Sequence, residues 1–297
     1  MANLPPPTQN QAYCTVSALE AGHLDLPLRV FLDNAAEGSV LNSPTLAFLI
    51  RHSKNNKTFV FDLGIRKDLQ ENAPPSVREW DKAFFNSQIP QDTAESLLKG
   101  GLSPADIDTV CISHCHWDHT GNTKLFPNSQ FVVGAGAADL FKPGYPEDPT
   151  SGFESDLLPA GRTRFLEFRD LPPLGIFPHA LDFYGDGSLY IVDAAGHLPG
   201  HVIAIARTSS DGGWILLGGD SAHHWNLITG ESQIAVGRPG FVGGCAHLDL
   251  SAATQNIERI RAFWKSPRTR VILAHDAPWY KENKDGDAFW PGHIESK

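Results

Sequence analysis

Three histidines and an aspartate lie within the six positions from His114 to His119, inside the segment Ser113-His114-Cys115-His116-Trp117-Asp118-His119-Thr120-Gly121-Asn122. The whole chain has 13 histidines, so this density is improbable by chance and indicates a functional motif. Imidazole nitrogens and carboxylate oxygens in such numbers suit zinc or a similar first-row metal. A closed structural zinc site is the alternative, but those sites usually contain cysteines in paired spacing, which this chain lacks.

The residues around this motif predict how its side chains are presented. The β-branched, mostly apolar run before the motif predicts a buried strand at about residues 108–113, which ends at His114. Alternate residues of an extended chain point to the same side, so His114 and His116 project together. Asp118 and His119 follow at a turn that starts a short helix. The spacing therefore predicts two neighbouring metal pockets, one at His114 and His116 and the other at Asp118 and His119.

A further imidazole is expected after a second strand. The run Tyr190-Ile191-Val192 has a strand pattern and leads into the sequence Asp193-Ala194-Ala195-Gly196-His197-Leu198-Pro199-Gly200-His201. Glycine lets a backbone turn tightly and approach a metal closely. His197 lies in this turn and is a candidate ligand. His201 begins the next apolar strand and is expected to be structural.

Two more strands end in residues that can bind a metal. Trp214-Ile215-Leu216-Leu217 runs into Gly218-Gly219-Asp220, which places a carboxylate at the tip of a strand. Val271-Ile272-Leu273-Ala274 ends in the same way at His275. A single histidine at a strand end is usually polar surface, but these two strand tips accompany the first motif and the histidine-rich turn. We therefore add Asp220 and His275 to the candidate ligands.

Together, the His-x-His-x-Asp-His motif, the Gly-His-Leu-Pro-Gly-His turn, the strand-end Asp220 and the Leu-Ala-His sequence at His275 resemble the metallo-β-lactamase superfamily over about residues 45–276. Within it, the chain is most similar to the dinuclear quorum-quenching lactonases. The resemblance implies an α+β fold, an αββα sandwich of two mixed β-sheets flanked by helices. It also implies two zinc ions per chain, with manganese, iron or cobalt as alternatives. The implied ligands are His114, His116 and His197 for the first metal, Asp118, His119 and His275 for the second, and Asp220 bridging both.

Such a ligand set indicates hydrolysis. Two metal ions about 3.5–4 Å apart can share a water and lower its pKa, so that a bridging hydroxide attacks a carbonyl carbon. The family implies that Asp118 also carries a proton to the leaving group. True β-lactamases of the superfamily lack the bridging aspartate, so Asp220 argues against that activity. The prediction is a hydrolase that opens a small cyclic ester, with a cyclic amide a close second; a thioesterase and a non-hydrolytic di-iron or metal-binding protein are the alternatives.

Substrate contacts are where the resemblance is weakest. The lactonases have a tyrosine three residues after the bridging aspartate, and here that position is His223. We hypothesise that His223 helps to hold the tetrahedral oxyanion; a histidine that supports the metal ligands or faces solvent is the alternative. Trp117 and Trp279 are predicted to be walls of a pocket for a small carbonyl compound. For each tryptophan, core packing is the alternative.

The composition excludes several classes of protein. A net charge of −10 disfavours a nucleic-acid partner, because phosphate binding needs clustered lysine and arginine. No stretch approaches the roughly 20 apolar residues of a membrane helix, and residues 1–10 do not read as a signal peptide. The four unpaired cysteines, with Cys115 as a buried spacer between two ligands, fit a reduced cytoplasmic protein. The lactonase resemblance makes a homodimer one candidate assembly.

The predicted organisation is a flexible or surface-laid N-terminal arm at residues 1–12, followed by a single catalytic domain at 13–297. Segment 142–171 is rich in Pro, Gly and charge, and we interpret it either as a lid over the site or as an ordinary surface insertion. One helix, at about residues 93–98, is expected inside an irregular stretch at 65–107. The helix with the clearest period is expected at 251–264, with Ile257, Ile260, Phe263 and Trp264 on one face. The first strands are expected at residues 13–20, 26–32, 45–51 and 58–62.

Overall fold

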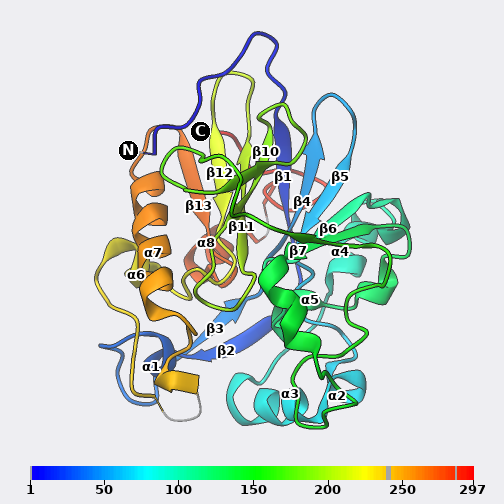
Figure 1. Ribbon diagram of the computed structural model, residues 1–297, viewed down its shortest axis with the longest axis vertical. Coiled ribbons are helices and arrows are strands. Elements are labelled where there is room, and N and C mark those ends of the chain that lie inside the picture. Colours follow the sequence, from blue (N-terminus) through cyan, green and yellow to red (C-terminus); the bar gives the residue numbers. More distant parts are fainter. Residues whose placement is uncertain (1, 239–241, 285) are drawn as a thin grey trace.

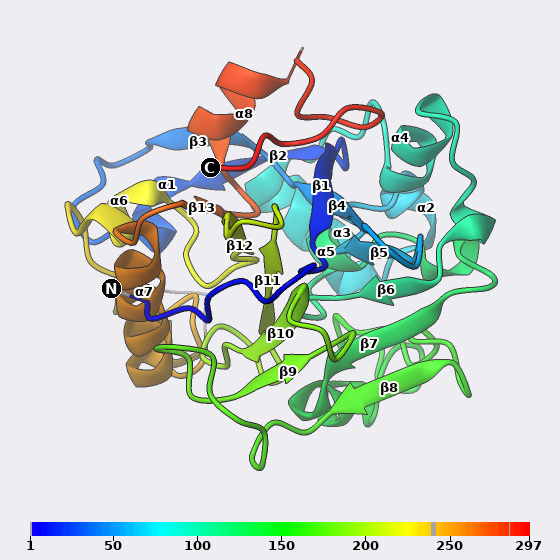
Figure 2. The same cartoon turned by 90° about the horizontal axis from the view of Figure 1, so that it is seen from above.

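Two β-sheets face each other at the centre of the molecule, and helices cover their outer faces (Figures 1 and 2). This computed structural model describes residues 2–238, 242–284 and 286–297. Each sheet contains both parallel and antiparallel pairs of strands. The α+β class and the αββα sandwich predicted from the sequence are therefore confirmed.

The first sheet has six strands in the order β1-β4-β5-β6-β7-β8. The strands from β5 to β8 run parallel, so their carboxyl ends meet at one edge of the sheet. The His-x-His motif follows β6 at this edge. The strands are β1 (Cys14–Leu19), β4 (Ala47–His52), β5 (Thr58–Phe61), β6 (Thr109–Cys111), β7 (Gln130–Gly134) and β8 (Thr163–Leu166).

The second sheet has five strands in the order β13-β12-β11-β10-β9. Within it β12 and β13 are the parallel pair, so the segments that follow them leave the sheet side by side. A separate two-stranded ribbon pairs β2 with β3. The strands are β9 (Ala180–Asp182), β10 (Leu189–Asp193), β11 (Val202–Arg207), β12 (Trp214–Leu217), β13 (Thr269–Ile272), β2 (His23–Pro27) and β3 (Val40–Pro44).

Apolar side chains fill the space between the two sheets. Phe48 and Phe59 of the first sheet belong to the same buried cluster as Ile191, Ala204 and Ile215 of the second. Every residue of β11 and β12 is buried, which explains why these strands appear as unbroken apolar runs in the sequence. Full burial of each large apolar side chain contributes about 1.5–3 kcal/mol relative to leaving it exposed. This packing provides a rigid platform for the loops at the sheet edges.

Helix α7 (Leu250–Trp264) covers the outer face of the second sheet. It begins after Asp249, whose carboxylate accepts a hydrogen bond from a backbone N–H of the first turn. Ile257, Ile260 and Phe263 are buried against the sheet, as the periodicity predicted. Trp264 was wrongly placed on that face: it follows Phe263 by about 100° around the helix and is 37% exposed.

The first sheet is covered by shorter helices. α4 confirms the helix expected near residues 93–98, and it begins with a capping box in which Asp92 and Glu95 satisfy each other's backbone N–H groups. Leu97 of this helix packs into the cluster on that side of the sheet. Besides α7, the α-helices are α1 (Leu28–Phe31), α2 (Leu69–Asn72), α3 (Pro75–Trp80), α4 (Thr93–Lys99), α5 (Trp117–Thr120), α6 (Trp225–Thr229) and α8 (Ala277–Asn283).

Several short elements correct the sequence-based expectations. Residues 26–32 were expected to be one strand, but β2 ends at Pro27 and the chain continues as α1. Pro27 has no backbone N–H for a sheet and its φ is compatible with the start of a helix. The stretch 65–107 was expected to hold one helix, yet it also contains α2, α3 and the π-helical turn η1 (Asp81–Phe85). Helices of four to six residues are too short to show a helical period.

Both segments interpreted as loops make defined contacts. Segment 142–171 contains β8, which extends the first sheet by pairing parallel with β7. In the N-terminal arm, Ala2 is buried and its backbone N–H donates to Ser266 Oγ. The carbonyl oxygen of Pro5 accepts a hydrogen bond from the Arg207 guanidinium. Among the described residues, no helix combines the length and the apolar character that crossing a bilayer requires.

Candidate metal centre

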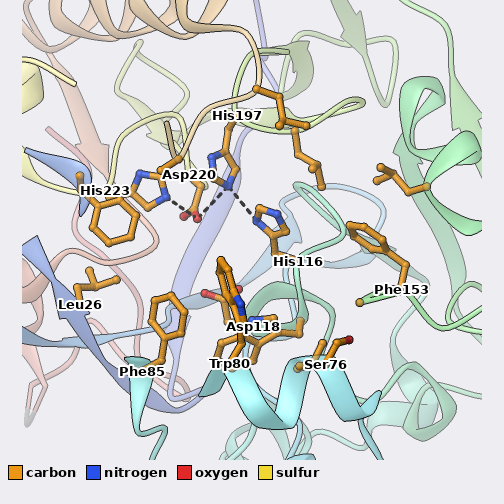
Figure 3. A pocket seen from close by; sticks show the side chains of 18 of the residues that line it. Leu26, Ser76, Trp80, Phe85, His116, Asp118, Phe153, His197, Asp220 and His223 are labelled. Carbon is orange, nitrogen blue, oxygen red and sulfur yellow. Dashed lines mark hydrogen bonds and ion pairs between the residues drawn. The ribbon is translucent and has the colours of Figure 1, made fainter. Parts of the chain in front are cut away.

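Three of the predicted ligands form one compact group of imidazoles. His114 follows β6, His116 lies at the start of α5, and His197 lies in the glycine-containing turn after β10. His116 Nδ1 is 3.0 Å from His114 Nε2. It is also 3.0 Å from His197 Nε2, a contact that Figure 3 shows. Two residues from the edge of the first sheet thus meet one from the edge of the second.

The other predicted ligands form a second group beside the first. His119 and Asp118 both lie in α5, and His275 follows β13. Asp118 Oδ2 is 3.7 Å from His119 Nε2 and 3.5 Å from His275 Nε2. All three side chains are buried.

Asp220, which follows β12, lies between the two groups. Its Oδ2 is 3.7 Å from His114 Nε2 and 3.5 Å from His197 Nε2. Its Oδ1 faces the other way, 3.3 Å from His119 Nε2 and 3.4 Å from His275 Nε2. One carboxylate therefore offers a separate oxygen to each group, the arrangement that a ligand shared by two metal ions requires.

The side chains present fit a pair of metal ions. Each group, with Asp220 counted in both, offers ligand atoms that lie within 4.8 Å of one another. His119 Nε2 and Asp220 Oδ1 are buried without any hydrogen-bond partner, which is costly unless another group satisfies them. Burial and the neighbouring imidazoles hold the pKa of His114 and His197 well below the ordinary range, so both rings are neutral and present lone pairs. The site therefore suits dinuclear metal binding.

Asp62 supports His119 and the neighbouring Ser113, and it was not identified from the sequence. Its carboxylate accepts hydrogen bonds from the Ser113 N–H at 2.6 Å, the Ser113 hydroxyl at 2.8 Å and His119 Nδ1 at 3.0 Å. The last bond leaves His119 Nε2 free to bind a metal. The available signal was its place directly after a strand, which is the same signal that pointed to Asp220.

His201 holds Asp220 in place, in agreement with the structural role expected for it. Burial lowers its pKa to about 3, so the ring is neutral. Its Nδ1 donates to the carbonyl oxygen of Ala194, and its Nε2 accepts from the backbone N–H of Asp220 at 3.1 Å. Gly219 makes this approach feasible, because its φ is +49° and a Cβ there would lie 2.9 Å from His201 Nε2.

His223 is buried and lines the cavity beside the metal ligands. Its Nε2 is 3.2 Å from Asp220 Oδ2, and its ring stacks on Phe31 at a centroid distance of 4.3 Å (Figure 3). His247, a buried residue that was not identified from the sequence, packs against His223 with a distance of 5.2 Å between the ring centroids. His223 is therefore not the exposed residue of one sequence-based alternative.

A cavity of about 420 Å³ opens onto the ligands. Trp117 lines it, as predicted, with its ring packed against Phe85. Trp279 does not line it among the described residues: it is buried between the sheets and packs against Phe289. The described residues that line it are Leu26, Phe31, Ser76, Val77, Trp80, Phe85, His116, Trp117, Asp118, Leu140, Thr150, Gly152, Phe153, His197, Leu198, Asp220, His223, Cys245, Ala246, Leu248 and His275.

Two walls of the cavity come from segments 65–107 and 142–171, for which the sequence predicted few regular elements. α3 and η1 contribute Val77, Trp80 and Phe85; Figure 3 shows Trp80 and Phe85 below His223 and His197. Segment 142–171 contributes Thr150, Gly152 and Phe153, and the Phe153 ring lies beside the His116 ring. Part of this segment therefore borders the site, while β8 within it belongs to the sheet. Cys115 points away into the apolar core, as expected for a spacer.

The comparisons with known proteins agree with this geometry. The chain matches the model of the metallo-beta-lactamase superfamily over residues 41–275, and it belongs to that superfamily. It is 32% identical, over 93% of its length, to the cytochrome P450 monooxygenase mpaDE' of Penicillium brevicompactum, of which it spans only 34%. It is 35% identical to the gamma-lactamase FDB1 of Fusarium pseudograminearum, over 67% of this chain and 50% of that protein.

Solved structures share the fold at low sequence identity. A structure of an N-acyl homoserine lactone hydrolase, with the product N-hexanoyl-L-homoserine at its catalytic metal centre, superposes with a TM-score of 0.71. The two chains are 17% identical, and the match covers 94% of this chain and 98% of the other. At this identity the likeness establishes the architecture and not the substrate.

Proposed function

We propose that this protein is a metal-dependent hydrolase that opens a small cyclic ester, with a cyclic amide as a close second substrate class. The observation that carries the proposal is the position of Asp220, whose two oxygens face two different groups of ligands. The names of a gamma-lactamase relative and of a lactone hydrolase with the same fold support the choice of ring-opening. Asp220 also separates this site from the β-lactamases of the superfamily.

The proposed ligands are those that the geometry brings together: His114, His116 and His197 on one side, Asp118, His119 and His275 on the other, and Asp220 between them. We propose zinc, because it binds imidazole nitrogens and carboxylate oxygens and keeps an open position in catalytic sites. Bound there, the two ions would polarise a carbonyl oxygen and lower the pKa of a water.

The side chains of the cavity supply the remaining steps. Burial opposes ionisation of Asp118, but the imidazoles of His119 and His275 keep its pKa below the usual value. As an ionised carboxylate at the cavity surface, Asp118 can take up a proton and deliver it to the leaving oxygen or nitrogen. With Asp220 bound to the metals, the N–H of His223 Nε2, which here faces Asp220 Oδ2 at 3.2 Å, would be available to the oxygen that becomes negative during the attack. Trp117 is proposed as a substrate-contacting wall.

His223→Phe tests the role of that histidine. Loss of one donor to a developing oxyanion lowers turnover by about 100-fold. The variant should therefore lose activity while metal analysis still finds two ions per chain. His179→Phe is a matched control, because His179 is partly exposed and does not line the cavity. Unchanged turnover with the metals retained would dismiss the proposal for His223.

A substrate panel with and without chelator tests the function as a whole. The panel contains alkyl lactones, lactams, thioesters and a chromogenic β-lactam, and plasma emission spectroscopy measures the metals. We expect about two zinc ions per chain, turnover of lactones above lactams, and loss of all turnover after chelation. Turnover that survives complete removal of metal would contradict the dinuclear mechanism.

We also propose that residues 13–297 act as a single catalytic domain in the cytoplasm. The four cysteines are buried and unpaired, which fits a reducing compartment. Limited proteolysis tests the domain proposal, since one protease-resistant fragment without internal cuts is expected. Light scattering coupled to size-exclusion chromatography tests the homodimer.

A further inference from the structure

The walls of the cavity are mainly apolar, and its polar surface is mainly the metal centre. Apart from the metal centre, its surface comes mainly from five aromatic and several aliphatic side chains: Phe31, Trp80, Phe85, Trp117, Phe153, Leu26, Val77, Leu140, Leu198, Ala246 and Leu248. Figure 3 shows Leu26, Phe85 and Trp80 below the ligands His197 and Asp220, with Phe153 on the far side of His116. A substrate whose carbonyl reaches the ligands must therefore place the rest of its surface against these side chains.

The charged groups of the lining all belong to the metal centre. Among the described residues that line the cavity, none is a lysine or an arginine. Arg66, on the segment that follows β5, is engaged elsewhere: its guanidinium bonds Asp68 at 2.7 Å and Glu154 at 3.0 Å. Ser76 is one of the few other polar groups in the lining, and its hydroxyl donates to the carbonyl oxygen of Ser151. A second anionic group on a substrate would find no lysine or arginine among the lining residues that the structure describes.

Burying an ion without a partner is expensive. A carboxylate or phosphate held away from the reacting ring would lose its hydration against an aromatic surface, which costs far more than the burial of a neutral group. The chain also carries a net charge of −10, which opposes the approach of anions over a longer distance. The first effect arises inside the cavity and persists in salt, whereas the second is screened.

We infer that the cavity selects neutral substrates with an apolar body and discriminates against those that carry a carboxylate or phosphate away from the reacting ring. This inference rests on the proposed function, because it concerns the substrate of the same site. It separates the chain's substrates from carboxylate-bearing β-lactams, glutathione thioesters and coenzyme A thioesters. The discrimination is made by the apolar walls and not by the metal ligands.

A pair of lactones tests the inference directly. Both have the same five-membered ring and the same hydrocarbon chain, which ends in a methyl group in one compound and in a carboxylate in the other. With the metal-loaded protein at 0.5 M salt, we expect kcat/KM for the neutral lactone to exceed that for the acid by about tenfold or more. Equal values would overturn the inference and leave the proposed function standing.

A charge added at the cavity wall tests where the selection is made. Leu248 lines the cavity and is 49% exposed, so an arginine there can reach solvent and the cavity. Leu250 is 41% exposed and does not line the cavity, so Leu250→Arg adds the same charge nearby as a control. Leu248→Arg should raise kcat/KM for the acid about fivefold through a lower KM. Leu250→Arg should leave the tenfold gap in place. Equal effects of the two variants would contradict selection by the cavity.

Binding of inert analogues separates this inference from the proposed function. Cyclic ketones with the same two chains cannot be hydrolysed, and the fluorescence of Trp80 and Trp117 in the lining reports their binding. We expect the neutral ketone to bind about tenfold more tightly than the acid, whether or not either lactone is hydrolysed. If neither lactone is hydrolysed, the proposed function is refuted, but the inference about the cavity is not. Tighter binding of the acid would refute the inference.

Discussion

Asp220 is the residue on which both proposed metal positions depend. Asp220→Asn keeps the shape of the side chain but removes its charge and replaces one ligand oxygen with an NH₂ group. We expect metal content to fall from two ions per chain to at most one, and kcat/KM to fall by at least about 100-fold. Metal analysis and lactone turnover measure the two effects, with the exposed Asp170→Asn as the charge-matched control. Two tightly bound ions in Asp220→Asn would contradict the bridging role.

Asp62 shows that a residue outside the ligand set can determine the ligand geometry. Its carboxylate accepts from three donors, two on Ser113 and one on His119. Asn has a single carbonyl oxygen, so in Asp62→Asn the amide NH₂ would face one of these donors. Its backbone φ of +62° is tolerated by asparagine, so the substitution isolates the change in hydrogen bonding.

We expect Asp62→Asn to weaken binding of one metal ion by about 10- to 100-fold while leaving the other in place. Competition with a chromophoric chelator measures the two dissociation constants separately. Asp170→Asn should show wild-type constants. Equal weakening of both ions would show that Asp62 supports the whole site rather than the position that contains His119.

At the scale of elements, the contact between residues 150–154 and the α2–α3 region shapes the cavity. Glu154 forms two hydrogen bonds with the Arg66 guanidinium, and both side chains are largely buried. Ser76 at the start of α3 bonds the carbonyl oxygen of Ser151. These contacts fix the position of Phe153 beside His116. These contacts hold residues 150–154 in a fixed position at the cavity.

Glu154→Gln tests this attachment. Loss of the charged pair should let Phe153 move, so KM for a neutral lactone should rise about three- to tenfold while kcat changes by less than a factor of two. Steady-state kinetics separate the two parameters. Asp156→Asn is the control, because its pair with Lys124 lies at the surface. A fall in kcat with KM unchanged would place the role of the segment in the chemical step instead.

The same elements show what the sequence could and could not reveal. Strands and candidate ligands were predictable because a buried strand has a local pattern and His114, Asp220 and His275 each lie three residues beyond a strand end. The cavity walls were not, because α3 and η1 are too short to show a period and reach the site only through the folded chain. Trp279 lies in α8, and its closeness to His275 in sequence does not reveal that this helix buries it in an apolar cluster and not at the cavity.

At the scale of the whole molecule, each proposed metal position joins the two sheets. His114, His116, Asp118 and His119 all follow β6 of the first sheet. His197, Asp220 and His275 follow strands of the second. Each group takes ligands from both sets, so each bound ion would connect the edges of both sheets. The unfolded chain cannot hold these ligands together, which couples metal binding to global stability.

We therefore expect removal of metal to destabilise the entire fold and not only the site. A metal present at about 1,000 times its dissociation constant adds about 4 kcal/mol to the free energy of unfolding, which corresponds to a rise in Tm of roughly 10 °C for a chain of this size. Differential scanning calorimetry of the chelated and zinc-restored protein measures this shift. In Asp220→Asn the shift should be smaller, because both metal positions lose a ligand. Equal Tm values with and without zinc, when metal analysis shows that the ions were removed and restored, would mean that the ions do not clamp the two sheets together.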